Sequence, residues 1–209
     1  MLGRTIYRAD SRGPNLLAQP NLPMRFEETE LSGAYIIRLQ ENEDERGSFV
    51  RTFCRTEFEK RGLNSRVVQC SISYNLKRGT LRGLHYQELP YAEAKLVTCL
   101  TGSIYDVIVD LRRDSPTYGQ WIALELNARR PRALLYVPEY FAHGFQTLED
   151  NTEVFYQMAQ SYNAAAARGL RWNDPALNIQ WPDNRPILSE RDRNFSDFIP
   201  DPELRKLDG

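Results

Sequence analysis

The segment Ser103–Leu111, with the sequence SIYDVIVDL, is the part of the chain that decides the fold class. Its apolar side chains recur at every second position, whereas Asp106 and Asp110 fall on the opposite face. The apolar positions are Tyr105, Val107, Val109 and Leu111. A period of two residues is typical of a β-strand that buries one face and exposes the other. The segment therefore predicts a half-buried strand.

Further strand signals lie on both sides of this segment. The turn sequence Thr101-Gly102, directly before it, predicts a hairpin that joins it to a strand at Lys95–Leu100. Runs of β-branched and aromatic residues bounded by turn residues predict three more strands, at Trp121–Leu126, Ala133–Val137 and Glu153–Met158. Many short strands with turns between them predict a β-sandwich or β-barrel.

Helical signal is confined to two places. Arg55–Arg61 predicts one or two helical turns, and the charged tail Ser189–Leu207 predicts a short helix. Residues 1–23 contain Gly and Pro and show no hydrophobic period, so we expect an N-terminal arm that is either disordered or in contact with a partner subunit. The remaining residues, 24–209, are expected to form one all-β domain with a few short helices.

Composition excludes several classes of protein. A length of 209 residues fits one domain. The 27 Lys and Arg nearly balance the 28 Asp and Glu, for a net charge of -1, so the chain has no positive field for nucleic acid or an anionic membrane. No apolar run reaches the roughly 20 residues that span a bilayer, and the N-terminus does not resemble a secretory signal. Three cysteines without a CxxC pair, Cys54, Cys70 and Cys99, indicate small core thiols in a reducing compartment, and we expect a cytoplasmic location.

The two histidines of the chain lie in the segments Gly79–Gln87 (GTLRGLHYQ) and Val137–Phe145 (VPEYFAHGF). A barrel that holds a metal would carry two histidines one residue apart, a glutamate soon after them and a third histidine downstream. Here Gly83 and Gln87 occupy the positions two residues from His85. The sequence therefore predicts no metal site.

Arg82 and His85 lie close together in sequence, and Lys95 follows ten residues later. Arginine and lysine are almost never fully buried unless they are paired, so a cluster of this kind at the mouth of a barrel favours an anionic ligand. Regular strand geometry would direct Arg82 and His85 to opposite faces. Gly83 would have to allow a bulge that lets the two converge.

Seven motifs in order, from about Met24 to Phe198, resemble the dTDP-4-dehydrorhamnose 3,5-epimerase family, a metal-free cupin family. They are Asp44–Gly47 (DERG), Arg82–Gln87 (RGLHYQ), Lys95–Val97 (KLV), Ser115–Gly119 (SPTYG), Phe141–Phe145 (FAHGF), Trp172–Pro175 (WNDP) and Leu188–Asp192 (LSERD). The resemblance implies a cupin-type jelly roll and a homodimer without a cofactor. It also implies epimerisation of a nucleotide-linked 4-keto-6-deoxy sugar, most simply dTDP-4-dehydro-6-deoxy-D-glucose to dTDP-4-dehydro-β-L-rhamnose.

The resemblance also implies roles for individual residues. His85 would be the base that removes a proton next to the ketone, and Asp192 would orient it. Lys95 would stabilise the enolate, and Tyr156 would return a proton to the other face. The residues that would bind the nucleotide and sugar are Arg46, Gln69, Ser71, Arg82, His143 and Arg191.

Three positions depart from the family pattern. Ser71 replaces a usual Asn, Arg51 replaces a usual Glu, and Ala167 replaces another Glu. All three positions are associated with substrate binding. They leave open an epimerase that acts at C3 alone on a dTDP or CDP sugar. A cupin that binds a nucleotide sugar without catalysis is a further alternative, which the intact His85 and Tyr156 disfavour.

Overall fold

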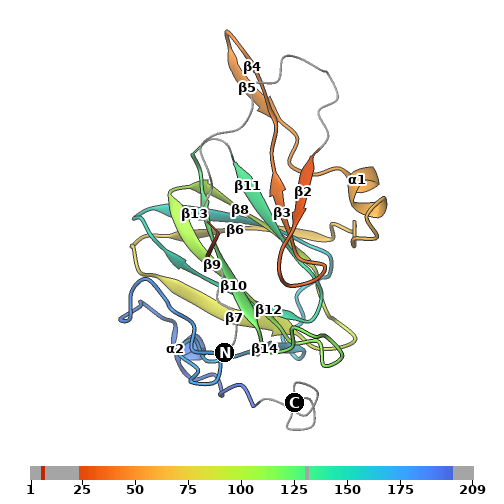
Figure 1. The fold of residues 1–209 in the computed structure, drawn as a ribbon. Helices are drawn as coiled ribbons and strands as arrows, with labels where there is room; N and C mark the ends of the chain where they lie inside the picture. Colours follow the sequence, from red (N-terminus) through yellow and green to blue (C-terminus); the bar gives the residue numbers. More distant parts are fainter. Residues whose placement is uncertain (1–5, 8–23, 130–131, 200–209) are drawn as a thin grey trace.

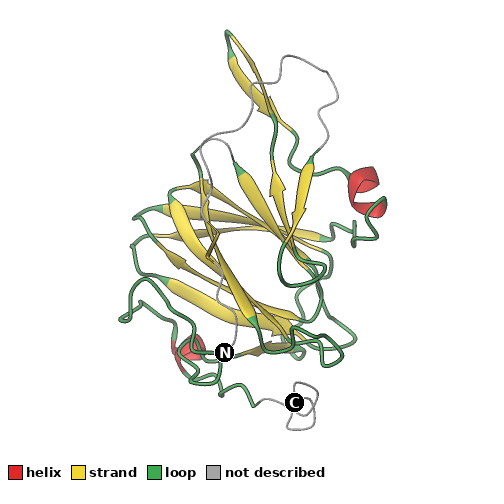
Figure 2. Cartoon of the chain, viewed as in Figure 1, coloured by secondary structure: helices red, strands yellow, loops and turns green. Residues whose placement is uncertain are grey.

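A computed structural model describes residues 6–7, 24–129 and 132–199, which form two six-stranded sheets packed face to face (Figures 1 and 2). The first sheet has the spatial order β1 (Ile6–Tyr7), β10 (Trp121–Asn127), β9 (Ser103–Asp110), β12 (Phe141–Thr147), β7 (Leu81–Gln87) and β14 (Ala167–Gly169). The second has the order β2 (Arg25–Glu28), β3 (Tyr35–Arg38), β11 (Ala133–Val137), β8 (Lys95–Thr101), β13 (Thr152–Met158) and β6 (Gln69–Asn75). From β6 to β9, successive strands alternate between the sheets, as in a jelly roll. The all-β prediction is confirmed.

Three smaller elements lie outside the two sheets. Strands β4 (Glu41–Asp44) and β5 (Gly47–Val50) form a separate hairpin that projects from the body (Figure 1). The two predicted helical segments both contain a short helix, α1 (Arg55–Glu59) and α2 (Glu190–Arg193). Of the expected N-terminal arm only β1 is described, paired in parallel with β10, and the rest lies outside the described residues. In the part of the chain that is described, no helix is long and apolar enough to cross a membrane.

Strand β9 is buried on both faces, so the prediction of a half-buried strand is wrong. All eight of its residues are buried. Ile104 and Ile108 belong to the main core cluster, whereas Tyr105, Val107 and Val109 pack in a second cluster with Leu170, Leu177 and Ile179. The C-terminal segment thus covers the face of Tyr105, Val107 and Val109, whereas the face of Asp106 and Asp110, which was expected to meet solvent, is turned toward the second sheet. Asp106 and Asp110, which alternate with the second set, are fully buried and need partners inside the protein.

The Thr101-Gly102 turn does not form the predicted hairpin. Strand β8 pairs with β11 and β13 in the second sheet, whereas β9 pairs with β10 and β12 in the first. The turn therefore carries the chain from one sheet to the other. Gly102 has a φ of 75°, and a Cβ there would clash with Thr152, which explains the glycine.

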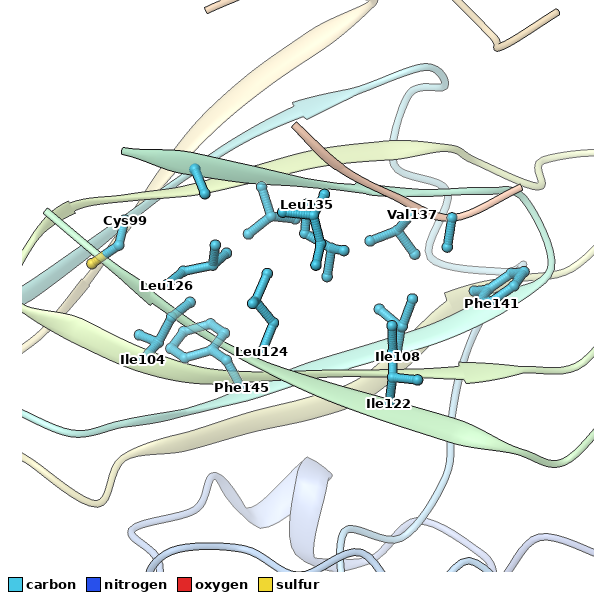
Figure 3. Packing of buried hydrophobic residues seen from close by; sticks show 14 of the residues in the cluster. Cys99, Ile104, Ile108, Ile122, Leu124, Leu126, Leu135, Val137, Phe141 and Phe145 are labelled. Carbon is cyan, nitrogen blue, oxygen red and sulfur yellow. The ribbon is translucent and has the colours of Figure 1, made fainter. Parts of the chain in front are cut away.

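The main core fills the space between the two sheets (Figure 3). Leu124, Leu135 and Phe145, from three different strands, point into this space and are at most 1% exposed. Burial of each such side chain contributes about 1.5–3 kcal/mol. Beside α1, a third cluster surrounds Phe58. Of the cysteines only Cys99 lies in the core; Cys70 is exposed, which corrects the expectation for that thiol.

Strand β7 contains one extra residue opposite β12. His85 pairs with His143 and Arg82 pairs with Phe145, so three steps along β7 match two along β12. The register shift is the bulge that convergence of Arg82 and His85 requires. Gly83 has a φ of 130°, and a Cβ there would lie 2.5 Å from the Cα of Gly144. Only glycine fits this close approach of two backbones.

We expect Gly83→Ala to lower the free energy of unfolding by more than its matched control Gly47→Ala. Gly47 has nearly the same φ, 128°, but nothing lies within 4 Å of its missing Cβ. The conformational strain common to both substitutions costs about 1–3 kcal/mol. Overpacking against Gly144 adds about 1–3 kcal/mol for Gly83→Ala alone. Urea unfolding measures both variants, and equal losses would contradict the close-approach explanation.

Candidate active site

His85 and Tyr156 lie on opposite sheets. His143 lies between them, paired with His85 across two strands and in ring contact with Tyr156. His85 on β7 is directly paired with His143 on β12, so their side chains lie on the same face of the first sheet. The ring of His143 meets the ring of Tyr156, on β13, with centroids 6.0 Å apart and an angle of 74°. Tyr156 also packs against the main core cluster. The arrangement brings residues of the two sheets together at one point of the sandwich.

His85 forms a hydrogen-bonded pair with Asp192. Its Nε2 lies 2.8 Å from Asp192 Oδ1, and the carboxylate side chain is only 6% exposed. Asp192 is positioned by α2, whose N-cap Ser189 accepts a hydrogen bond from the Asp192 backbone N–H. The backbone N–H of Gly83 donates to the other carboxylate oxygen at 3.3 Å. The bulge in β7 and the cap of α2 therefore both serve to hold this pair.

The electrostatics of the pair leave one ring nitrogen of His85 free to accept a proton. Burial alone would raise the pKa of Asp192, but hydrogen bonds from His85, Gly83 and Ser189 and the charge of His85 outweigh it and hold the pKa below its ordinary value. An ionised carboxylate only accepts hydrogen bonds, so Nε2 of His85 carries the hydrogen. Nδ1 of the neutral imidazole then has the free lone pair that a general base needs.

Lys95, the first residue of β8, points its ammonium group at the backbone of His85. Its Nζ donates to the His85 carbonyl oxygen at 3.2 Å and forms an ion pair with Glu93 Oε1, also at 3.2 Å. The Lys95 side chain is only 9% exposed. A fixed positive charge next to His85 is suited to stabilise negative charge on a bound molecule.

Tyr156 lies in surroundings that keep its phenol protonated. Burial raises the pKa of Tyr156 well above its ordinary value, and the charge of Asp106 raises it further, against an opposing effect of Arg82. Arg82 in turn donates from Nε to the side-chain oxygen of Asn75 at 2.7 Å. A phenol that stays protonated can act as an acid toward a strongly basic carbon.

Asp106 is a residue that the sequence reasoning missed. Its Oδ1 lies 2.6 Å from Nε2 of His143, so His143 forms a second histidine–aspartate pair, buried in the sandwich. The signal was available in the sequence, because Asp106 interrupts an apolar strand and a buried carboxylate needs a partner. The period of two residues predicted instead that Asp106 lies on the exposed face of a half-buried strand.

Two of the predicted substrate-binding residues, Gln69 and Arg191, contact Tyr162, a residue that was not predicted. The backbone N–H of Tyr162 donates to Gln69 Oε1 at 3.0 Å, and Arg191 donates to the Tyr162 hydroxyl at 3.3 Å. Ser71, two residues after Gln69, is directly paired with Tyr156. Gln69 and Ser71 therefore lie on the strand that pairs with β13, the strand of Tyr156, and Tyr162 connects Gln69 with Arg191 of α2.

Arg46 is not brought to this cluster. It lies in the turn of the projecting β4–β5 hairpin, with its side chain 84% exposed, and forms an ion pair with Asp44. Within its own chain it therefore has no described contact with His85 or Tyr156.

The described residues contain no group of three or more His, Cys, Asp or Glu side chains placed to hold a metal ion. Gln87, at a position where a metal-dependent barrel would carry a ligand, is 3% exposed. Its amide bonds to the protein instead, accepting from the Asn163 N–H and donating to the Tyr91 carbonyl oxygen.

Comparison with known proteins identifies one family. The family model described as dTDP-4-dehydrorhamnose 3,5-epimerase matches residues 28–199. A protein of that name from Shigella flexneri is 41% identical over 177 residues, which cover 84% of this chain and 97% of the relative.

Two solved structures extend this similarity to the fold. A dTDP-4-dehydrorhamnose 3,5-epimerase from Bacillus anthracis, with TDP and PPi bound, superposes with a TM-score of 0.80 at 41% identity, covering 84% of this chain and 99% of that one. ChmJ, a 3'-monoepimerase from Streptomyces bikiniensis in complex with dTDP-quinovose, superposes with a TM-score of 0.76 at 31% identity, covering 81% and 86%. The predicted cupin-type fold and the predicted family are confirmed.

The depressed pKa of Asp192 predicts a pH-dependent contribution to stability. The ordinary value is 3.8, so the ionised carboxylate stabilises the fold above that pH and loses this effect as the pH falls through the folded-state pKa. We expect Asp192→Asn to cost about 1–3 kcal/mol near pH 6 and clearly less near pH 3. Urea unfolding at both pH values measures the difference.

Asp197→Asn is the matched control, because Asp197 is 45% exposed and pairs with Arg171 on the surface. It should change the free energy of unfolding by less than about 1 kcal/mol near pH 6. An effect of Asp192→Asn that is the same at both pH values would contradict the assigned origin of the shift.

Proposed function

The chain belongs to the dTDP-4-dehydrorhamnose 3,5-epimerase family and is an isomerase, and we propose that it converts dTDP-4-dehydro-6-deoxy-D-glucose into dTDP-4-dehydro-β-L-rhamnose. One observation supports the proposed mechanism. His85 is hydrogen-bonded to a buried carboxylate, and Tyr156 is a phenol whose pKa is raised. The two come from opposite sheets, and His143 contacts Tyr156 between them. A base and an acid on two sides of a sugar ring are what inversion at carbon requires.

The reaction begins with removal of a proton next to the C4 ketone. Nδ1 of His85 accepts this proton, and Asp192 stabilises the imidazolium that forms. The electrons of the broken C–H bond move into an enolate on the C4 oxygen. The ammonium group of Lys95 stabilises that oxyanion, an effect typically worth about 10²–10³ in rate.

Tyr156 then donates its proton to the same carbon from the opposite face. The raised pKa of Tyr156 keeps the proton in place until the enolate, a stronger base, accepts it. His85 and Tyr156 recover their starting states by proton exchange with solvent. The chemistry uses groups of the chain itself, and we propose that no cofactor takes part.

Polar and charged side chains around this point would bind the substrate. Arg82 and Arg191 suit the diphosphate, because a guanidinium forms paired, charge-assisted hydrogen bonds with phosphate oxygens. Gln69, Ser71 and His143 would bind the nucleotide and the sugar. The relative from Bacillus anthracis was solved with TDP and PPi bound, which supports a thymidine nucleotide here as well.

Inversion at C3 alone is the second candidate. Ser71, one of the departures from the family pattern, is directly paired with Tyr156, the proposed acid. A shorter side chain beside the acid can change which carbon meets the phenol. The likeness to ChmJ, a 3'-monoepimerase, supports this candidate, although the identity to it is lower, 31% against 41% for the Bacillus protein.

We also propose a homodimer in which each hairpin serves the site of the other subunit. Arg46 is exposed on the projecting hairpin and has no described contact with its own site. Strand β6 lies at one edge of its sheet and exposes Ile72 and Tyr74, and Leu76, directly after the strand, is exposed as well, so a second copy would cover this edge.

The cytoplasm remains the proposed location. Cys54, Cys70 and Cys99 form no disulfide with one another, which suits a reducing compartment.

Isotope exchange tests the reaction and its alternatives. Incubation of the protein with dTDP-4-keto-6-deoxyglucose in D₂O should place deuterium at C3 and C5, detected by NMR or mass spectrometry. Exchange at C3 alone would favour the second candidate. The CDP and UDP analogues test the nucleotide. Absence of exchange with all three sugars would exclude epimerisation and leave a nucleotide-sugar-binding protein.

Two variants separate the base from the acid. His85→Ala should abolish exchange at both carbons, because no group remains to remove the proton; the fold persists because His85 is 40% exposed. Tyr156→Phe should still exchange but lose net inversion by about 10²-fold or more, since the proton returns to the face it left. If Tyr156→Phe inverts at the normal rate, another group or a water is the acid.

Complementation tests the shared site. Arg46→Ala should raise KM about tenfold or more through the lost phosphate contact. When Arg46→Ala and His85→Ala chains are co-expressed in equal amounts, about a quarter of all sites combine an intact Arg46 with an intact His85 from the other chain. At substrate concentrations well below KM, where sites without Arg46 contribute little, we expect activity near that fraction of wild type. If Arg46 serves its own chain, every site lacks either Arg46 or His85, and activity at low substrate stays below about a tenth of wild type.

A further inference from the structure

A buried carboxylate, Glu93, lies beside the ammonium group of Lys95 in the loop that joins β7 to β8. Their ion pair spans 3.2 Å, and the two side chains are only 10% and 9% exposed. Charged side chains are almost never this buried without a partner. The pair thus fixes Lys95 in a region that is largely closed to water.

The ammonium group of Lys95 is held by two neighbours. An ammonium group has three N–H bonds. One donates to the backbone carbonyl oxygen of His85, and the carboxylate of Glu93 is the ion-pair partner of Nζ. Among the described residues, no hydrogen bond or ion pair of Nζ with any other residue is present. The hydrogen bond and the ion pair together fix the position of Nζ, so Glu93 and His85 aim an N–H that remains free for a ligand.

Glu93 is itself held by Gln87, which is 3% exposed. The Gln87 amide nitrogen lies 3.4 Å from Glu93 Oε2 and also donates to the carbonyl oxygens of Tyr91 and Ser161. These bonds connect the end of β7, the loop before β8 and the turn after β13. Glu93 is therefore held in place by a hydrogen-bond network, unlike a charged side chain that is exposed on the surface.

We propose that Glu93 is a positioning residue of the reaction, which directs the free N–H of Lys95 toward the C4 oxygen of the sugar. The inference rests on the proposed function, in which Lys95 stabilises the enolate. A negative charge beside Lys95 does not itself stabilise an enolate, so the effect of Glu93 is geometric. Because both C3 and C5 are activated through the same C4 carbonyl, Glu93 influences the chemistry at both carbons equally.

Variants at Glu93 test this role through a split between kcat and KM. Displacement of a catalytic group by about 1 Å can cost about 10²-fold in rate, so we expect Glu93→Ala to lower kcat by about that factor. Glu93→Gln keeps the size and an acceptor oxygen, and should lower kcat about tenfold. KM should stay within about threefold for both, since the nucleotide contacts are intact. Deuterium exchange at C3 and C5 should slow by the same factor.

Glu88→Gln is the matched control in the same loop. Glu88 is 48% exposed and pairs with Arg168 at the surface, so its substitution should leave kcat and KM within about twofold of wild type. Melting temperatures show whether each variant is folded. If Glu93→Ala fails to fold, the kinetics of the near-isosteric Glu93→Gln variant test the inference.

A double-mutant cycle shows whether Glu93 acts through Lys95. In a chain that already carries Lys95→Ala, Glu93→Gln should change kcat by less than about twofold. An unchanged kcat in Glu93→Gln alone, or an equal loss with and without Lys95, would overturn the inference. If Lys95→Ala itself leaves kcat unchanged, the role of Lys95 in the proposed function fails, and that result is distinct from a failure at Glu93 alone.

Discussion

The hydrogen bond between His85 and Asp192 is the interaction on which the rest of the site depends. It joins β7 of the first sheet to α2 in the C-terminal segment. The carboxylate reaches the imidazole because β7 bulges at Gly83 and because Ser189 caps α2. The same C-terminal segment buries the outer face of β9. The segment that completes the fold therefore also supplies the partner of the proposed base.

Buried charge is organised in the same way throughout the sandwich. Asp106 pairs with His143, Glu93 with Lys95, and Asp110 with Arg112, Ser115 and Thr117. Each carboxylate is removed from water and is tolerable only because a donor lies within hydrogen-bond distance. Such pairs are weak sources of stability, since desolvation opposes the attraction. Their effect is geometric, because they fix the two imidazole rings and the ammonium group that take part in the proposed reaction.

The sequence predicted the strands well, because their period of two and their turn residues are local properties. Ala133–Val137 was predicted with the bounds that the structure has. Pairing was predicted less well: the Thr101-Gly102 turn carries the same signal whether the two strands pair or enter different sheets. The burial of Asp106 was missed for a similar reason. An alternating strand does not reveal whether its second face meets solvent or another sheet, and here the face of Asp106 points into the space between the two sheets. The site residues came from a resemblance, and periodicity alone would have left Lys95 and Asp192 as surface charges.

The sandwich architecture fits the proposed mechanism, in which an acid and a base act on opposite faces of one ring. Within a single sheet, neighbouring side chains that point the same way approach a ligand from one side. His85 and Tyr156 come from different sheets, so their side chains enter the space between the layers from opposite directions. Lys95 belongs to the second sheet but bonds to the backbone of His85, which ties its ammonium group to the side of the base. In the proposed mechanism, the stereochemistry of inversion therefore depends on which sheet each strand joins.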